Sequence, residues 1–308
     1  MVTPAEVDLE VQVGTLRFRS PVIAASGTFG YGEEFSPFLD LSRLGGFVTK
    51  GLSLAPREGN PPPRIVETPS GMLNAIGLQN VGVDRFISEK LPRLRQFDTV
   101  VIANVFGETV EEYTAVCRRL DAAEGVHAIE LNVSCPNTAH GGMTFGTDPA
   151  ALHEVTAAAR AATRLPLWVK LTPNVTDIGA LARIAVAAGA DALSLVNTFT
   201  GMTVDIERRR PTLANVRGGL SGPAIRPLAL HLLHEVRRSV DVPLIGMGGI
   251  AAADHALQFL MVGASAVQVG TANYVAPAIG VTLAADLATW CAAHDVRAVR
   301  DVVGTLSL

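Results

Sequence analysis

Two similar segments decide the fold class: Ala188-Gly189-Ala190-Asp191-Ala192-Leu193 and Val262-Gly263-Ala264-Ser265-Ala266-Val267. In each, a helical pattern ends at a glycine suited to a left-handed helix cap, and an apolar strand follows at once. The preceding helices are expected over residues 180–188 and 252–262. Repeated units of helix, glycine and strand indicate parallel βαβ construction with right-handed crossovers.

Outward from these units, eight short β-rich runs alternate with helical patterns. The runs are residues 22–25, 47–50, 100–105, 129–133, 167–171, 192–196, 244–246 and 266–269. Eight units in 308 residues favour an α/β fold of the (β/α)8 TIM barrel type, with an open doubly wound sheet as the alternative. Residues 7–18 alternate around Gly14 and predict an N-terminal β-hairpin that closes the bottom of the barrel. No linker divides the chain, so a single domain over residues 1–308 is expected.

Composition narrows the class of protein. Hydrophobic residues make up 48% and charged residues 18% of the chain, which suits a large core and argues against disorder. The net charge of −4 comes without a basic run, so we expect small-molecule ligands, no nucleic acid and no membrane. The three cysteines are too few and too scattered for a disulfide framework. With no signal-peptide pattern at the start, a soluble cytoplasmic protein is expected.

One strand end carries unusual chemistry. The run Glu130-Leu131-Asn132-Val133-Ser134-Cys135-Pro136-Asn137-Thr138 ends a strand in a cysteine and a proline flanked by asparagines. Buried structural cysteines lie inside apolar elements, as expected for Cys117 and Cys291, so Cys135 is interpreted as a reactive thiol. Long connections over residues 51–82, 134–147 and 197–223 are expected at the same catalytic face.

Every expected strand places a polar or glycine residue at one rim. These residues are Ser26, Lys50, Asn104, Asn132, Lys170, Asn197 with Thr198, Gly248 with Gly249, and Gly270 with Thr271. A single asparagine is usually a turn former, but together they predict a ring of amides around two lysines. The Lys170 amine suits an ion pair at the rim, a Schiff base, or the stabilisation of a developing anion.

Two glycine-containing segments point to a ligand. The glycines after the last two strands favour a phosphate group, with tight turns as the alternative. Residues 71–80 form a mostly uncharged loop suited to a flat polar ligand, or a packed surface loop. The histidines lack metal-ligand spacing, so no metal site is expected. No Gly-x-Gly-x-x-Gly element follows the first strand, so Rossmann-type dinucleotide binding is unsupported.

At these residues the chain resembles the dihydroorotate dehydrogenase family, from about residue 24 to residue 271. The resemblance lies in Asn-Val-Ser-Cys-Pro-Asn at 132–137, Val-Lys-Leu-Thr-Pro-Asn at 169–174, Gly-Gly-Leu-Ser-Gly-Pro at 218–223, Ile-Gly-Met-Gly-Gly-Ile at 245–250 and Val-Gly-Thr at 269–271. The cysteine at position 135 is similar to class 1. Residues 25–30 and 74–80 are most similar to class 1B, the NAD-linked subclass.

The resemblance implies FMN in the barrel mouth and (S)-dihydroorotate stacked on its ring. It implies Cys135 as the base, with Lys170 stabilising charge on the reduced flavin. The implied flavin contacts are Ser26, Lys50, Gly51, Asn104, Asn132, Lys170, Val196, Gly222, Gly248, Gly249, Gly270 and Thr271. The implied substrate contacts are Lys50, Asn74, Ala75, Ile76, Gly77, Leu78, Asn132, Asn137, Asn197 and Thr198.

The resemblance also implies a partner. Class 1B catalytic subunits form the homodimer core of a heterotetramer with an electron-transfer subunit that carries FAD and a [2Fe-2S] cluster. This chain lacks four cluster cysteines, so NAD reduction would need that subunit. Three other functions remain open: a dihydropyrimidine dehydrogenase-like flavin barrel, a cofactor-free lyase with a Schiff base on Lys170, and a non-catalytic binding barrel.

Overall fold

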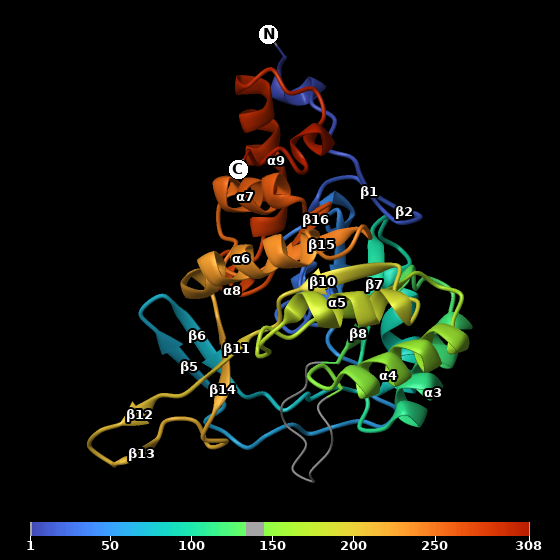
Figure 1. The fold of residues 1–308 in the computed structure, drawn as a ribbon, viewed down its shortest axis with the longest axis vertical. Coiled ribbons are helices and arrows are strands. Elements are labelled where there is room, and N and C mark those ends of the chain that lie inside the picture. Colours follow the sequence, from blue (N-terminus) through green and yellow to red (C-terminus); the bar gives the residue numbers. More distant parts are fainter. Residues whose placement is uncertain (1, 134–144, 308) are drawn as a thin grey trace.

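The computed structural model describes residues 2–133 and 145–307 of the chain. Eight parallel strands close into a barrel in which each strand pairs with its neighbours in chain order (Figure 1). They are β3 (Val22–Ala24), β4 (Gly46–Val48), β7 (Val100–Val105), β8 (Ala128–Asn132), β9 (Leu167–Lys170), β10 (Ala192–Leu195), β15 (Leu244–Met247) and β16 (Ala266–Val269). Pairing of β16 with β3 closes the cylinder, which confirms the barrel over the open sheet.

Helices cover the outside of the barrel, and consecutive ones pack side by side (Figure 1). The longer ones are α3 (Val110–Asp121), α4 (Pro149–Ala162), α5 (Ile178–Ala187), α6 (Arg226–Arg237), α7 (Ala253–Val262) and α9 (Ile279–Ala293). Short helical turns are α1 (Val83–Arg85), η4 (Phe86–Lys90), α2 (Leu91–Leu94) and α8 (Ala272–Val275), with single 3-10 turns at η1 (Pro4–Glu6), η2 (Glu33–Phe35), η3 (Leu41–Arg43), η5 (Pro223–Ile225) and η6 (Val299–Val302). This alternation with the strands is the (β/α)8 arrangement.

The helix ends follow the expected chemistry. Asp148 caps α4 by accepting a hydrogen bond from the Ala151 amide at 2.8 Å, and proline occupies the first helical position. Gly263 caps α7 with a left-handed φ of 117°. Gly189 likewise has a positive φ of 105°, one residue beyond the cap of α5. Both repeated units that decided the fold class are therefore confirmed.

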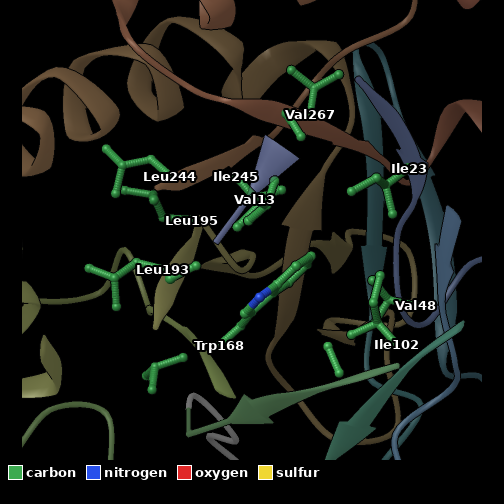
Figure 2. Close-up of a cluster of buried hydrophobic side chains, with 14 of the residues drawn as sticks. Val13, Ile23, Val48, Ile102, Trp168, Leu193, Leu195, Leu244, Ile245 and Val267 are labelled. Atoms are coloured by element: carbon green, nitrogen blue, oxygen red, sulfur yellow. The ribbon is translucent and has the colours of Figure 1, made fainter. Parts of the chain in front are cut away.

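The predicted hairpin is present as β1 (Val11–Val13) and β2 (Leu16–Phe18), and it packs into the core. The Phe18 and Trp168 rings lie 6.1 Å apart between centroids, and both side chains are fully buried. Figure 2 shows Trp168 among apolar side chains of the barrel strands, with Val13 of the hairpin in the same cluster. The hairpin therefore buries its apolar face against the barrel core, which stabilises both.

The two described long connections contain strands that the sequence analysis missed. A four-stranded antiparallel sheet has the order β11-β14-β6-β5, with β5 (Ile65–Thr68) and β6 (Gly71–Asn74) from one connection and β11 (Phe199–Gly201) and β14 (Gly218–Ser221) from the other (Figure 1). A further hairpin, β12 (Val204–Asp205) and β13 (Arg210–Pro211), extends beyond it. The prediction of a loop at residues 71–80 was therefore wrong for residues 71–74. Strand pairing between the connections satisfies backbone groups that single loops would leave to water.

Within residues 2–133 and 145–307, no helix combines the length and the apolar composition needed to cross a bilayer.

Candidate active site

The carboxyl ends of the barrel strands bring most of the predicted residues together. In a TIM barrel these ends and their connections form the catalytic face. Cys135 and Asn137, together with most of the connection at residues 134–147, lie outside the described residues. The remaining predicted residues occupy five groups around the mouth of the barrel.

The first group joins the ends of β3 and β4. Ser26 donates a hydrogen bond to the Thr49 carbonyl at 2.7 Å, and the Lys50 amide donates to the Gly30 carbonyl at 2.7 Å. Burial lowers the pKa of the Lys50 ammonium, and the nearby positive charge of Arg64 lowers it further, against the opposing effect of Glu34. Lys50 is therefore a half-buried cation held at the mouth, where it would attract an anion.

The second group surrounds a residue to which the sequence analysis gave no role. Glu130 of β8 is fully buried, and its carboxylate accepts a hydrogen bond from Asn104 Nδ2 at 2.8 Å. Ser194 and Gln268 also donate to it, at 2.8 and 2.7 Å. The ammonium of Lys170 lies 3.8 Å from Glu130 Oε1, and its side chain is 7% exposed. This ion pair partners the Lys170 amine with a buried carboxylate inside the barrel.

A signal for Glu130 exists in the sequence. A glutamate in an otherwise apolar strand two residues before Asn132 faces the same side of the strand as that asparagine. A buried carboxylate needs donors, and the sequence alone does not show which residues supply them. Gln268 and Ser194 come from strands far along the chain, so only the closed barrel reveals the set.

The third group links β8 to the segment after β10. Asn197 Nδ2 donates to Asn132 Oδ1 at 3.3 Å, and Asn197 Oδ1 accepts from the Thr198 amide at 2.8 Å. Asn174, a residue of the family motif with no assigned role, donates to the Thr198 carbonyl at 3.1 Å. The predicted substrate residues Asn132, Asn197 and Thr198 are therefore neighbours, and the side chains of the two asparagines are hydrogen-bonded to each other.

Strand β6 and the turn after it bring a second set of predicted substrate residues. Asn74 faces Gly219 of β14 in register, and its Nδ2 atom lies 3.4 Å from the Gly219 carbonyl oxygen. Beyond it, Ala75 is buried, while Ile76, Gly77 and Leu78 are half-buried. Leu78 has a φ of 59°, which is uncommon for a residue with a side chain. The extra sheet therefore fixes the path of residues 74–78.

The glycines after the last two strands make close backbone contacts. A Cβ at Gly249, where φ is 70°, would lie 2.8 Å from the Gly222 carbonyl oxygen, so these two predicted residues are adjacent. Thr271 donates a hydrogen bond to Ser221 at 2.8 Å, which joins the end of β16 to β14. A Cβ added at Gly270 would have no neighbouring atom nearer than 3.7 Å, so this residue, unlike Gly249, is not tightly packed. Val196 is buried beside this group, with its amide bonded to the Met247 carbonyl at 3.1 Å.

The other cysteines are packing residues, as predicted. Cys117 on α3 and Cys291 on α9 are fully buried. Burial raises the pKa of the Cys117 thiol to about 12 and also raises that of Cys291. The described residues contain no cluster of histidine, cysteine and acidic side chains that could hold a metal ion.

Comparison with known proteins agrees with this geometry. The family model described as dihydroorotate dehydrogenase matches residues 8–290. The chain is 57% identical over 298 residues to the catalytic subunit of dihydroorotate dehydrogenase B (NAD(+)) of Trichlorobacter lovleyi. The aligned region covers 97% of this chain and 98% of that protein. Proteins of the same description from Pelobacter propionicus and Geotalea daltonii are 56% and 54% identical, over 97% and 99% of this chain and 98% and 100% of theirs.

Proposed function

This chain belongs to the dihydroorotate dehydrogenase family, and from that premise we propose that it is the catalytic subunit that oxidises (S)-dihydroorotate to orotate in pyrimidine biosynthesis. The observation that carries the proposal is the convergence of Lys50, Asn132, Lys170 and Asn197 at one end of the closed barrel. Within the proposal, the chain is one cytoplasmic FMN-binding domain over residues 1–308.

The residues present fit FMN. Asn104 Oδ1 is buried and, among the described residues, has no hydrogen-bond partner, so it is ready to accept one from a ring N–H. Gly51 lies against that atom, since a Cβ there would be 3.0 Å away. The glycines at 222, 248 and 249 all have positive φ and bring backbone close to the mouth, as a phosphate group requires. We assign the remaining flavin contacts to Ser26, Lys50, Asn132, Lys170, Val196, Gly270 and Thr271.

The proposed chemistry divides the reaction between a base and a hydride acceptor. When bound, FMN accepts the hydride that leaves C6 of the substrate. The thiolate of Cys135 takes the proton from C5. Lys50 holds the substrate carboxylate, while Asn74, Asn132, Asn137 and Asn197 bind the polar edges of the ring, with Thr198 and residues 75–78 enclosing it. Lys170 places a positive charge, partly offset by Glu130, in a low-dielectric site, where it stabilises developing negative charge.

We further propose that electrons leave through a separate subunit. The relatives are named as catalytic subunits of an NAD(+) enzyme, and a name of that kind implies a second subunit. The electron-transfer subunit would carry FAD and a [2Fe-2S] cluster and bind a homodimer of this chain in a heterotetramer. Purification of the complex from its native cells, followed by iron and FAD analysis, tests this part.

A single-turnover measurement tests the reaction itself. Anaerobic dihydroorotate should bleach the flavin absorbance, at a rate that rises with pH around the ordinary thiol pKa of about 8.5. Cys135→Ser should keep the flavin spectrum and slow the bleaching at neutral pH. A flat pH profile, or loss of FMN from the serine variant, would contradict the assignment of the base.

Substrate choice separates the proposal from its neighbours. Bleaching by dihydrouracil but not by dihydroorotate would favour a dihydropyrimidine dehydrogenase. Purified protein without flavin that is trapped by borohydride in the presence of substrate would favour a Schiff-base lyase. The ion pair between Lys170 and Glu130 favours the proposed flavin enzyme over a Schiff-base lyase, because a buried carboxylate already engages the lysine amine.

A further inference from the structure

We propose that Glu130 is a positioning residue of the cofactor site, which orients Lys170 and Asn104 and sets the charge balance that a bound flavin meets. This inference rests on the proposed function, because it concerns the flavin that we place there. Glu130 does not belong to any of the predicted groups of contact residues, and its role follows from its partners inside the barrel.

The partners of Glu130 come from four other strands of the barrel. Asn104 lies on β7, Lys170 on β9, Ser194 on β10 and Gln268 on β16. All four are donors, which is the set that an ionised carboxylate accepts. Because the carboxylate is fully buried, each donor is held in a low-dielectric interior where hydrogen bonds and charges interact strongly. One side chain therefore ties together the inner face of the barrel.

Strand register places Glu130 level with Asn104 and below Asn132 and Lys170, which are all proposed cofactor residues. On β8, Glu130 and Asn132 face the same side because side chains alternate along a strand. Glu130 pairs in register with Trp168, and Asn132 pairs with Lys170 one step further toward the catalytic end. Glu130 thus shares the register level of Trp168, two residues below Asn132 along β8.

Glu130 also decides which atom Asn104 presents. A carboxylate accepts hydrogen bonds only, so the Asn104 amide must turn its nitrogen toward Glu130 and its oxygen away. That oxygen is the buried acceptor beside Gly51 that has no partner among the described residues. Gln268 is oriented in the same way, with its nitrogen on Glu130 and its oxygen likewise unpaired in the described part of the chain. A flavin ring N–H then meets an acceptor rather than a competing donor.

The charge of Glu130 has a second consequence. The ammonium of Lys170 and the carboxylate of Glu130 are 3.8 Å apart and both are buried, so each offsets much of the field of the other. A neutral side chain at position 130 would remove this offset from the positive charge of Lys170. Since a reduced flavin carries additional negative charge, that change would favour flavin reduction.

The test measures the midpoint potential of FMN bound to the protein by spectroelectrochemical titration. The variant E130Q removes the charge and keeps the size of the side chain. We expect its equilibrium to shift about tenfold toward reduced flavin, which is about 30 mV for a two-electron couple. The matched control is S194A, which removes a neutral donor from the same carboxylate, and whose midpoint should stay at the wild-type value.

A second comparison, between K170M/E130Q and K170M, tests the same role in case E130Q alone does not fold. The double variant K170M/E130Q removes both charges of the ion pair together. Its midpoint should be higher than that of K170M alone. A midpoint that is unchanged or lowered by E130Q in either background, with FMN bound, would overturn the role of Glu130. Failure of the wild-type protein to bind FMN would instead overturn the proposed function, so the two failures are distinct.

Discussion

Asn197 Nδ2 donates a hydrogen bond to Asn132 Oδ1 at 3.3 Å, which connects the end of β8 to the segment that follows β10. The Asn197 oxygen is occupied by the Thr198 amide at the same time. Two carboxamides from separate strands therefore hold each other in a defined orientation at the barrel mouth. Such mutual positioning is what a site needs to bind a planar ring with several polar edges.

This relationship predicts the effect of Asn197→Ala. Loss of a hydrogen bond within the site, together with an unpaired partner, costs about 1–3 kcal/mol, so kcat/KM for dihydroorotate should fall about 5- to 150-fold. The protein should still bind FMN, because Asn197 is not among the proposed flavin contacts. Steady-state kinetics check this, with Asn215→Ala at an exposed position as the control. A normal kcat/KM in the Asn197 variant would remove it from the substrate site.

Lys50 predicts opposite effects on binding and stability. Loss of a charge-assisted contact with the substrate carboxylate costs about 1.5–3 kcal/mol, so Lys50→Met should raise KM about 10- to 150-fold. Since burial disfavours the Lys50 cation, the same variant should unfold at a temperature no lower than the wild type. Lys90→Met is the contrasting control, because Lys90 forms an ion pair with Glu33 and is not one of the predicted site residues. It should lose stability and keep KM.

The lowered pKa of Lys50 also gives a pH dependence of stability. The unfolded chain holds this proton up to the ordinary value of 10.5, whereas the folded protein releases it at lower pH. Between these two values the unfolded state binds more protons, so the contribution of Lys50 to the free energy of unfolding rises with pH. Urea titrations at several pH values should show this contribution in the wild type and not in Lys50→Met. A wild-type contribution that falls with pH across that window would contradict the burial of the cation.

The three cysteines predict a selective alkylation pattern. Cys117, with a pKa of about 12, and Cys291 are buried thiols and should not react with iodoacetamide in the native protein at pH 8. Cys135 should be labelled alone, and orotate should slow the labelling. Mass spectrometry of the digested protein measures the modified positions, with Cys135→Ser as the unlabelled control. Native labelling of Cys117 would show that α3 does not pack as described.

Gly249 predicts a loss of cofactor affinity that backbone strain alone does not explain. Gly249→Ala places a side chain on a backbone with a φ of 70°, a strain that costs about 1–2 kcal/mol. The added Cβ would also lie 2.8 Å from the Gly222 carbonyl oxygen. Gly304→Ala has the same type of strain at a φ of 74°, but nothing lies within 4 Å of its Cβ. Both variants should unfold more easily. Only the Gly249 variant should bind FMN more weakly in a fluorescence titration, and equal FMN affinity in the two would contradict the proposed contact.

Local sequence signals accounted for the barrel, with half of its strand boundaries exact and the others within two residues. Gly263, Asp148 and the apolar runs each act within a few residues, so their effect on helix caps and strands is readable without tertiary context. The predicted end of β8 at residue 133 was one residue too far, since Asn132 ends the strand. The strands β5, β6, β11 and β14 were missed because each pairs with a partner elsewhere in the chain or lies in a short run without strong alternation.

By itself, the sequence determined the order of the elements and the residue types at each strand end, because both depend on short-range periodicity and turn chemistry. Only the tertiary structure decided which of those residues meet. Glu130 contacts Gln268 across 138 positions of the chain, and Thr271 contacts Ser221 across 50. Closure of the barrel creates these contacts, since a buried carboxylate takes its donors from whichever strands the cylinder brings to it.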